Sequence, residues 1–414
     1  MKNIIIRLFA VLAAVTIAAG CIEETFPTGS TITSEQLDAS PNALQYLVNG
    51  IPSAMMASGT AGYASSYGYH ADFGLPAIHL MTESMLEDFT ISGQLGYFWL
   101  GAFFQNVAMG ADYIYCSYFW DCYYAWIKAV NDVIVRAGVV DEETDPTILS
   151  ALGQAYAYRA MCYLDLARLY EPKQNLYVPV DMALEGLTVP KVTEKTTPSE
   201  AADNRRMHRE DMYEFILNDL SVAEKCFAAA AMPESVTRPS LYGVYGLFAR
   251  AYMEMAYWGP EIDKEACGKV VEYADKVIAA FTPLNETQWH DPSNGFNRSA
   301  SNSAWVWALS LDSSMTNNLF NFTAMMSPEA QFSYAQFTMP GINAWLYEQM
   351  PDAGFRKSSW YRSGSGLDYK YAGTLEDAAQ TKLYAREYMS LKKIKFYDII
   401  NSPINKNLLN GGKW

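Results

Sequence analysis

The chain has 414 residues, half of them hydrophobic, with 45 acidic and 30 basic side chains and a formal net charge of −15. A chain of this length and composition can bury a large core, which excludes a disordered protein. The excess of negative charge excludes nucleic-acid binding, because a polyanionic partner would be repelled.

The first residues follow the pattern of an export signal. A basic start leads into an uncharged apolar run, Leu8 to Ala19, and small residues precede Cys21. The run is too short for a transmembrane helix, which needs about 20 residues. The pattern is typical of a lipoprotein signal, residues 1–20, whose cleavage exposes Cys21 for lipidation; a plain secretory signal with an incidental cysteine is the alternative. We expect residues 21–40 to form an extended tether behind Cys21.

Without Cys21, the six cysteines of the chain leave five, so complete pairing within one chain is excluded. Cys162 and Cys226 fall within apolar helical patterns, which predicts buried free thiols. Whether Cys116 and Cys122 pair locally stays open. No cysteine belongs to a Cys-x-x-Cys unit or lies beside clustered histidines, so the sequence predicts no metal site.

The predicted elements begin with a helix after Pro41, where apolar residues recur at helical steps. Pro52 is expected to limit this helix to its opening part. Glycines and clustered aromatic residues then fill residues 59–117, which predicts long structured loops with short helices. Such loops are a common place for function.

Two long helices follow, predicted over residues 119–137 and 147–170 from apolar side chains at three- and four-residue steps. A polar break at 141–146 joins them, which predicts an antiparallel hairpin. Residues 171–204 are rich in Pro, Thr and charge without any period, which predicts an extended excursion.

The hairpin pattern then repeats, with helices predicted over residues 209–229, 238–258 and 264–280. The spacing Ala160-x-x-Tyr163-x-x-x-Ala167 recurs as Ala249-x-x-Tyr252-x-x-x-Ala256. Small residues at these steps let helices approach closely, as in tetratricopeptide-like arrays. The predicted fold class is all-α, with tetratricopeptide-like helical hairpins, long irregular loops and minor β structure.

Beyond Trp289 the helical period is lost again. Residues 305–309 alternate like a strand, and most of the remaining section is predicted to form loops over the helical scaffold. We expect residues 41–414 to form a single domain.

Several segments carry a resemblance to a known family. Residues 123–134 read YYAWIKAVNDVI and residues 158–170 read YRAMCYLDLARLY; Asp219-Leu220 lies late in the next helix, and Arg238 opens the one after it. With the signal before Cys21 and the late segment Asp352 to Arg356, their order and spacing resemble the SusD/RagB family of outer-membrane glycan-binding lipoproteins.

This resemblance implies an α-helical fold of tetratricopeptide-like hairpins, with irregular loops that form the ligand face. It implies a protein lipid-anchored in the outer membrane and facing the cell exterior; the pair Glu23 and Glu24 resembles a surface-export signal. It also implies a partner, a SusC-like TonB-dependent transporter, over whose mouth the protein sits as a lid. Family members usually continue through further helices, so the chain ending at Trp414 is either naturally short or truncated.

Aromatic residues make up 14% of the chain, with 29 tyrosines. Sugar capture without catalysis needs flat apolar faces that stack on pyranose rings, and Tyr and Trp on loops supply them at low entropic cost. The predicted ligand platform is drawn from the two loop regions: Tyr67, Tyr69, Tyr97, Trp99, Asn106 and Trp289. By contrast, Tyr123, Tyr156, Tyr163 and Trp126 lie at helical spacing and are predicted to be core residues.

Catalytic motifs are absent from the sequence. There is no His-Glu-x-x-His zinc motif, no Gly-x-Ser-x-Gly elbow and no phosphate loop, so we predict a non-enzyme without cofactor or metal. The alternatives are an anchored glycan hydrolase that uses Glu83 or Glu87 as acid or base, and a helical adaptor that binds peptides. The sequence does not distinguish a glycan ligand from a peptide.

Overall fold

The computed structural model of the chain divides into two compact units, Met1–Ala43 and Leu44–Trp414. The structure describes residues 40, 42–57, 72–85, 89–91, 114–141, 143–174, 180–289, 291, 304–309, 321, 324–325, 340–342, 344–354, 357, 360–362 and 369–371. Only residues 40, 42 and 43 of the first unit are among them. The predicted signal, its cleavage site at Cys21 and almost all of the predicted tether therefore lie outside the described residues.

The described part of the chain is mainly α-helical, as predicted. Its helices are α3 (Ala43–Met56), α5 (Leu75–Ser84), α7 (Ile114–Ala137), α8 (Pro146–Tyr170), α9 (Pro198–Ala202), α10 (Arg209–Ala230), α11 (Leu241–Met255), α12 (Lys264–Ala280), α13 (Glu286–Trp289) and α16 (Ala344–Gln349). Its strands, each of three residues, are β1 (Phe89–Ile91), β2 (Pro340–Ile342), β3 (Trp360–Arg362) and β4 (Tyr369–Tyr371). The helix predicted over 264–280 has the observed bounds of α12.

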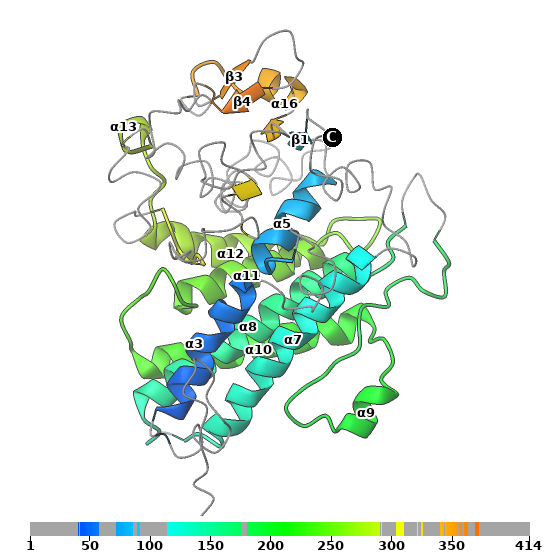
Figure 1. Ribbon diagram of the computed structural model, residues 1–414, viewed down its shortest axis with the longest axis vertical. Helices are drawn as coiled ribbons and strands as arrows, with labels where there is room; N and C mark the ends of the chain where they lie inside the picture. The colour runs from blue at the N-terminus through cyan, green and yellow to red at the C-terminus, as the bar shows by residue number, and fades with distance from the viewer. Residues whose placement is uncertain are drawn as a thin grey trace, which may run out of the picture. The chain divides into compact units, whose positions relative to one another are not determined.

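The consecutive long helices pack as neighbours. Helix α8 lies between α7 and α10 and also touches α11, while α11 packs against α12, and Figure 1 shows α7, α8 and α10 side by side. Small residues make α8 suitable for this central place: Ala160 and Ala167 are buried, and a Cβ added to Gly153 would lie 3.0 Å from the ring of Phe227. The predicted hairpin array is confirmed.

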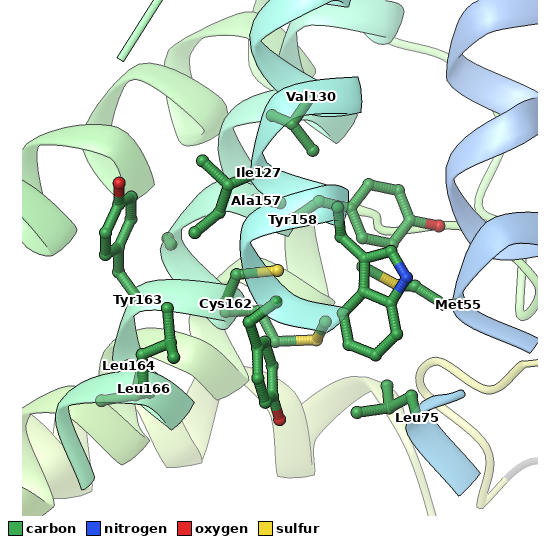
Figure 2. Close-up of a cluster of buried hydrophobic side chains, with 14 of the residues drawn as sticks. Met55, Leu75, Ile127, Val130, Ala157, Tyr158, Cys162, Tyr163, Leu164 and Leu166 are labelled. Atoms are coloured by element: carbon green, nitrogen blue, oxygen red, sulfur yellow. The ribbon is translucent and has the colours of Figure 1, made fainter. Parts of the chain in front are cut away.

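The central core is formed by side chains from several helices. Figure 2 shows Met55 of α3, Leu75 of α5, Ile127 of α7 and Cys162 of α8 within one buried cluster. The predicted core residues Tyr123, Trp126 and Tyr163 are each at most 1% exposed, and Tyr156 is partly buried against the same cluster. Desolvation of this aromatic and aliphatic surface is the main force that holds the helices together.

The start of α8 is specified locally. Asp145 occupies the N-cap position, and its carboxylate accepts a hydrogen bond of 2.7 Å from the Thr147 amide. Pro146 takes the first helical position, where a missing N–H costs nothing. At the other end, Glu171 adopts an extended conformation before Pro172, which ends the helix.

We expect the Asp145→Ala variant to lose about 1 kcal/mol in free energy of unfolding, because an N-cap acceptor is removed. Urea unfolding of the two proteins measures this loss. The Asp145→Ser variant is the control, since it keeps an acceptor at the cap and should lie close to the wild type. An equal loss in both variants would contradict the capping role.

Three local predictions are wrong. Pro52 does not end the first helix, since α3 continues through it to Met56, held by Ile51 and Met55, which are both fully buried. Residues 305–309 form no strand. Helix α11 begins three residues later than predicted, because Ser240 is extended and acts as its N-cap residue.

The minor β structure lies elsewhere than predicted. The four strands form one antiparallel sheet in the order β1-β2-β4-β3. Phe89 lies opposite Ile342, and Trp360 lies opposite Tyr371. The sheet thus joins β1, which falls within the predicted loop region 59–117, to strands beyond residue 339.

Candidate functional site

Most of the predicted site residues lie outside the part of the chain that the structure describes. This holds for the lipidation site Cys21 and for five of the six platform residues: Tyr67, Tyr69, Tyr97, Trp99 and Asn106. Their roles stay predictions.

Trp289, the sixth platform residue, is described. It closes α13 and packs with Leu284 and Trp305 in a small cluster apart from the main core, where it is only 4% exposed. Stacking on a sugar ring needs a free aromatic face. We therefore do not carry Trp289 forward as a platform residue.

Asn131, Arg159 and Asp219, which lie in the segments that resemble the SusD/RagB family, meet in a buried polar centre. Arg159 of α8 donates to both carboxylate oxygens of Asp219 of α10, at 2.7 and 2.8 Å. Its third bonding nitrogen, Nη1, donates to Asn131 Oδ1 of α7 at 2.9 Å and to Glu194 Oε2 at 2.7 Å. These four residues, the Arg159 network, connect three helices with the segment that follows α8. The resembling segments in the sequence contain Asn131, Arg159 and Asp219, but the sequence did not predict that these residues meet or that Glu194 joins them.

Mutual contacts favour the charged forms of Arg159 and Glu194, whereas burial raises the pKa of Asp219. Burial by itself would lower the pKa of Arg159, but hydrogen bonds and charge from Asp219 and Glu194 outweigh it and raise that pKa. At Glu194, burial opposes ionisation, yet the hydrogen bond and charge of Arg159 lower the pKa of this carboxyl. The rings of Tyr156 and Phe215 lie 5.1 Å from the guanidinium carbon and add cation–π contacts.

Residues 190–194, here called the strap, are fastened to the helices by the same region. Tyr124 donates to Pro190 O at 2.6 Å. The hydroxyl of Tyr163 accepts from the Val192 amide at 2.7 Å and donates to the Val192 carbonyl at 2.8 Å. The polar groups of the network bond to one another and to the strap, so the network holds the strap against the helices.

A second set of charges joins α8 to α11. Asp165 accepts hydrogen bonds of 3.0 Å from Tyr123 and from Arg250. Nearer the surface, Arg168 lies 2.6 Å from Glu254, and Lys173 lies 3.1 Å from the same carboxylate. Burial opposes ionisation of Glu254, but these two cations lower its pKa. The arrangement is again a connection between helices.

The structure describes only one of the two carboxylates, Glu83 and Glu87, named for the hydrolase alternative. Glu83 lies partly buried on α5, whereas Glu87 and Asp88 fall outside the described residues. Among the described residues, no group of three or more His, Cys, Asp or Glu side chains could hold a metal ion.

All five cysteines beyond Cys21 have free thiols, and Cys162 and Cys226 are buried as predicted. The open question of Cys116 and Cys122 is answered by α7, which carries both. Six positions on a helix separate Cα atoms by about 9 Å, and a disulfide needs less than about 7 Å. Burial raises the pKa of the Cys122 thiol, which keeps it protonated.

Comparison with known proteins identifies the helical array. Residues 69–253 match the family model SusD-like_3, described as starch-binding and associating with the outer membrane. This segment, somewhat less than half of the chain, is similar to the SusD-like family. The matched segment includes α7, α8, α10 and most of α11, so the Arg159 network lies within it.

Solved structures extend the likeness over most of the chain. A SusD-like carbohydrate binding protein from Bacteroides vulgatus has 17% identity and a TM-score of 0.60, with 89% of this chain and 75% of that chain covered. A SusD superfamily protein from Bacteroides thetaiotaomicron has 16% identity and a TM-score of 0.58, with coverages of 91% and 79%. Surface glycan-binding protein A from Bacteroides fluxus has 12% identity and a TM-score of 0.53, with coverages of 80% and 66%.

These likenesses establish the SusD-like fold. No curated protein matches the sequence. Within the described ranges, no helix is both long and apolar enough to cross a membrane.

Proposed function

We propose that the chain is a cell-surface lipoprotein that binds glycan nutrients without catalysis and passes them to a SusC-like TonB-dependent transporter in the outer membrane. The single observation that carries this proposal is the match of residues 69–253 to a family described as starch-binding and associating with the outer membrane. The signal pattern before Cys21 supports the membrane anchor, and the aromatic loop residues support stacking on sugars.

The fold suits a binding protein. The helical array is held together by buried ion pairs, and such a scaffold is the usual support for ligand-binding loops. The proposed platform consists of Tyr67, Tyr69, Tyr97, Trp99 and Asn106.

Binding is tested with affinity electrophoresis and calorimetry against a panel of glycans. We expect Trp99→Ala and Tyr97→Ala to weaken binding by about tenfold or more, which corresponds to about 1.4 kcal/mol for a central aromatic contact. Tyr46→Ala is the matched control, because Tyr46 is an exposed aromatic residue on α3 outside the platform. No binding to any glycan would contradict a glycan ligand and would make peptides the next class to test.

The absence of catalysis is tested in the same samples. Incubation with bound glycans should release no new reducing ends. Release that disappears in a Glu83→Gln or Glu87→Gln variant would establish the hydrolase alternative instead.

The anchor has its own test. We expect the Cys21→Ser variant to bind ligand normally in vitro and to lose surface retention and glycan uptake in cells. Uptake at the wild-type rate would show that the tether is incidental to function.

A further inference from the structure

A second polar cluster lies where α8 ends and α10 begins. Glu171, directly after α8, accepts a hydrogen bond of 3.1 Å through Oε1 from Nη1 of Arg209. The guanidinium of Arg209 lies 5.2 Å from the ring centre of Trp258, which follows α11. Tyr213, one turn after Arg209 on α10, meets Trp258 edge to face at 4.9 Å. Arg209 thus contacts both Glu171 and Trp258, and Trp258 in turn contacts Tyr213.

Three polar atoms of this cluster are buried without a hydrogen-bond partner: Oε2 of Glu171, the hydroxyl of Tyr213 and Nε1 of Trp258. The side chain of Glu171 is completely covered, and Tyr213 is fully buried. An unsatisfied buried polar atom costs about 1–3 kcal/mol. Three such atoms in residues gathered about Arg209 are therefore unusual in a folded protein.

The three atoms have complementary chemistry. The indole N–H can only donate, the carboxylate oxygen can only accept, and the phenol can do both. Burial raises the pKa of Tyr213, and the charges of Glu254 and Glu171 raise it further, so the phenol keeps its proton. A water molecule accepts two hydrogen bonds and donates two, and buried waters typically make about three.

We infer that Glu171, Tyr213 and Trp258 bind one enclosed water molecule, which accepts hydrogen bonds from Tyr213 and Trp258 and donates one to Glu171. This water ties the end of α8, the start of α10 and the connection after α11 to one another. The ligand is water and not a sugar, because all three atoms are covered from solvent. The site shares no residue with the proposed glycan platform, and the inference does not depend on that platform.

A crystal structure of the full chain, at a resolution that shows ordered water, tests the inference directly. We expect one density peak within about 2.6–3.2 Å of all three atoms. No peak, or a direct hydrogen bond between two of the three side chains, would overturn it.

In solution, the inference is tested by whether a substitution lowers or raises the equilibrium constant for folding. If the phenol bonds to water, Tyr213→Phe should lower the equilibrium constant for folding by about three- to tenfold. If the phenol has no partner, removing it should leave that constant unchanged or raise it, which would overturn the inference. Tyr257→Phe is the control, since Tyr257 is exposed and the loss of its hydroxyl group should not change the equilibrium constant for folding.

Discussion

Replacing Arg159 with methionine is expected to lower the free energy of unfolding by about 3–5 kcal/mol, because it leaves the buried carboxylate of Asp219 and the partly buried carboxylate of Glu194 without their cation. The side chain of Arg159 is 4% exposed and that of Asp219 is 1% exposed, so water cannot replace the lost partner. Glu194 would also lose the bond that holds the strap against α8. Urea unfolding followed by circular dichroism measures the effect.

The matched control for Arg159 is an ion pair on the surface. Lys128 and Asp132 lie 3.0 Å apart on α7, with side chains 79% and 54% exposed. We expect Lys128→Ala to change the stability by less than about 0.5 kcal/mol, since solvent screens exposed pairs. A loss below about 1 kcal/mol for Arg159→Met would contradict the proposed role of the network.

The Gly74→Ala variant is expected to lose about 3 kcal/mol or more of stability, for two reasons that add. Gly74, the N-cap of α5, has φ of 75°, a conformation that side chains with a Cβ rarely adopt. An added Cβ would also lie 2.2 Å from the carbonyl oxygen of Met55 at the end of α3. Thermal unfolding monitored by circular dichroism measures the loss.

Gly246 provides the control for this substitution. It lies within α11, and a Cβ added there would meet no atom within 4 Å. Gly246→Ala should therefore be neutral or stabilise the protein by about 0.5–1 kcal/mol, because alanine is the better helix former. A similar loss at both positions would show that the close approach of α3 and α5 does not matter.

Helix positions were largely predictable from the sequence, because they depend on local signals. Apolar residues at three- and four-residue steps mark the buried faces, and Asp145-Pro146 marks the start of α8. Pro52 misled the prediction, since its local cost is smaller than the burial gained by Ile51 and Met55 on the same helix.

The ligand-binding site was less predictable from the sequence than the helices. Trp289 is an aromatic residue at the start of a predicted loop region, as expected of a residue that stacks on a sugar. In the structure, however, it packs with Leu284 and Trp305 and is buried. Sequence patterns show which residues could stack on a sugar, but exposure depends on how distant segments cover them.

By itself the sequence determined the fold class, the order of the helices, the free and buried cysteines Cys162 and Cys226, and the expectation of a SusD-like family. These follow from periodicity, capping and motif order, which act over a few residues. Only the tertiary structure decided that Arg159, Asn131, Glu194 and Asp219 share one polar centre, and that Arg209 contacts both Glu171 and Trp258. Such contacts join residues far apart in the sequence, such as Arg159 and Asp219, which are 60 positions apart, and they form only when close packing brings the helices together.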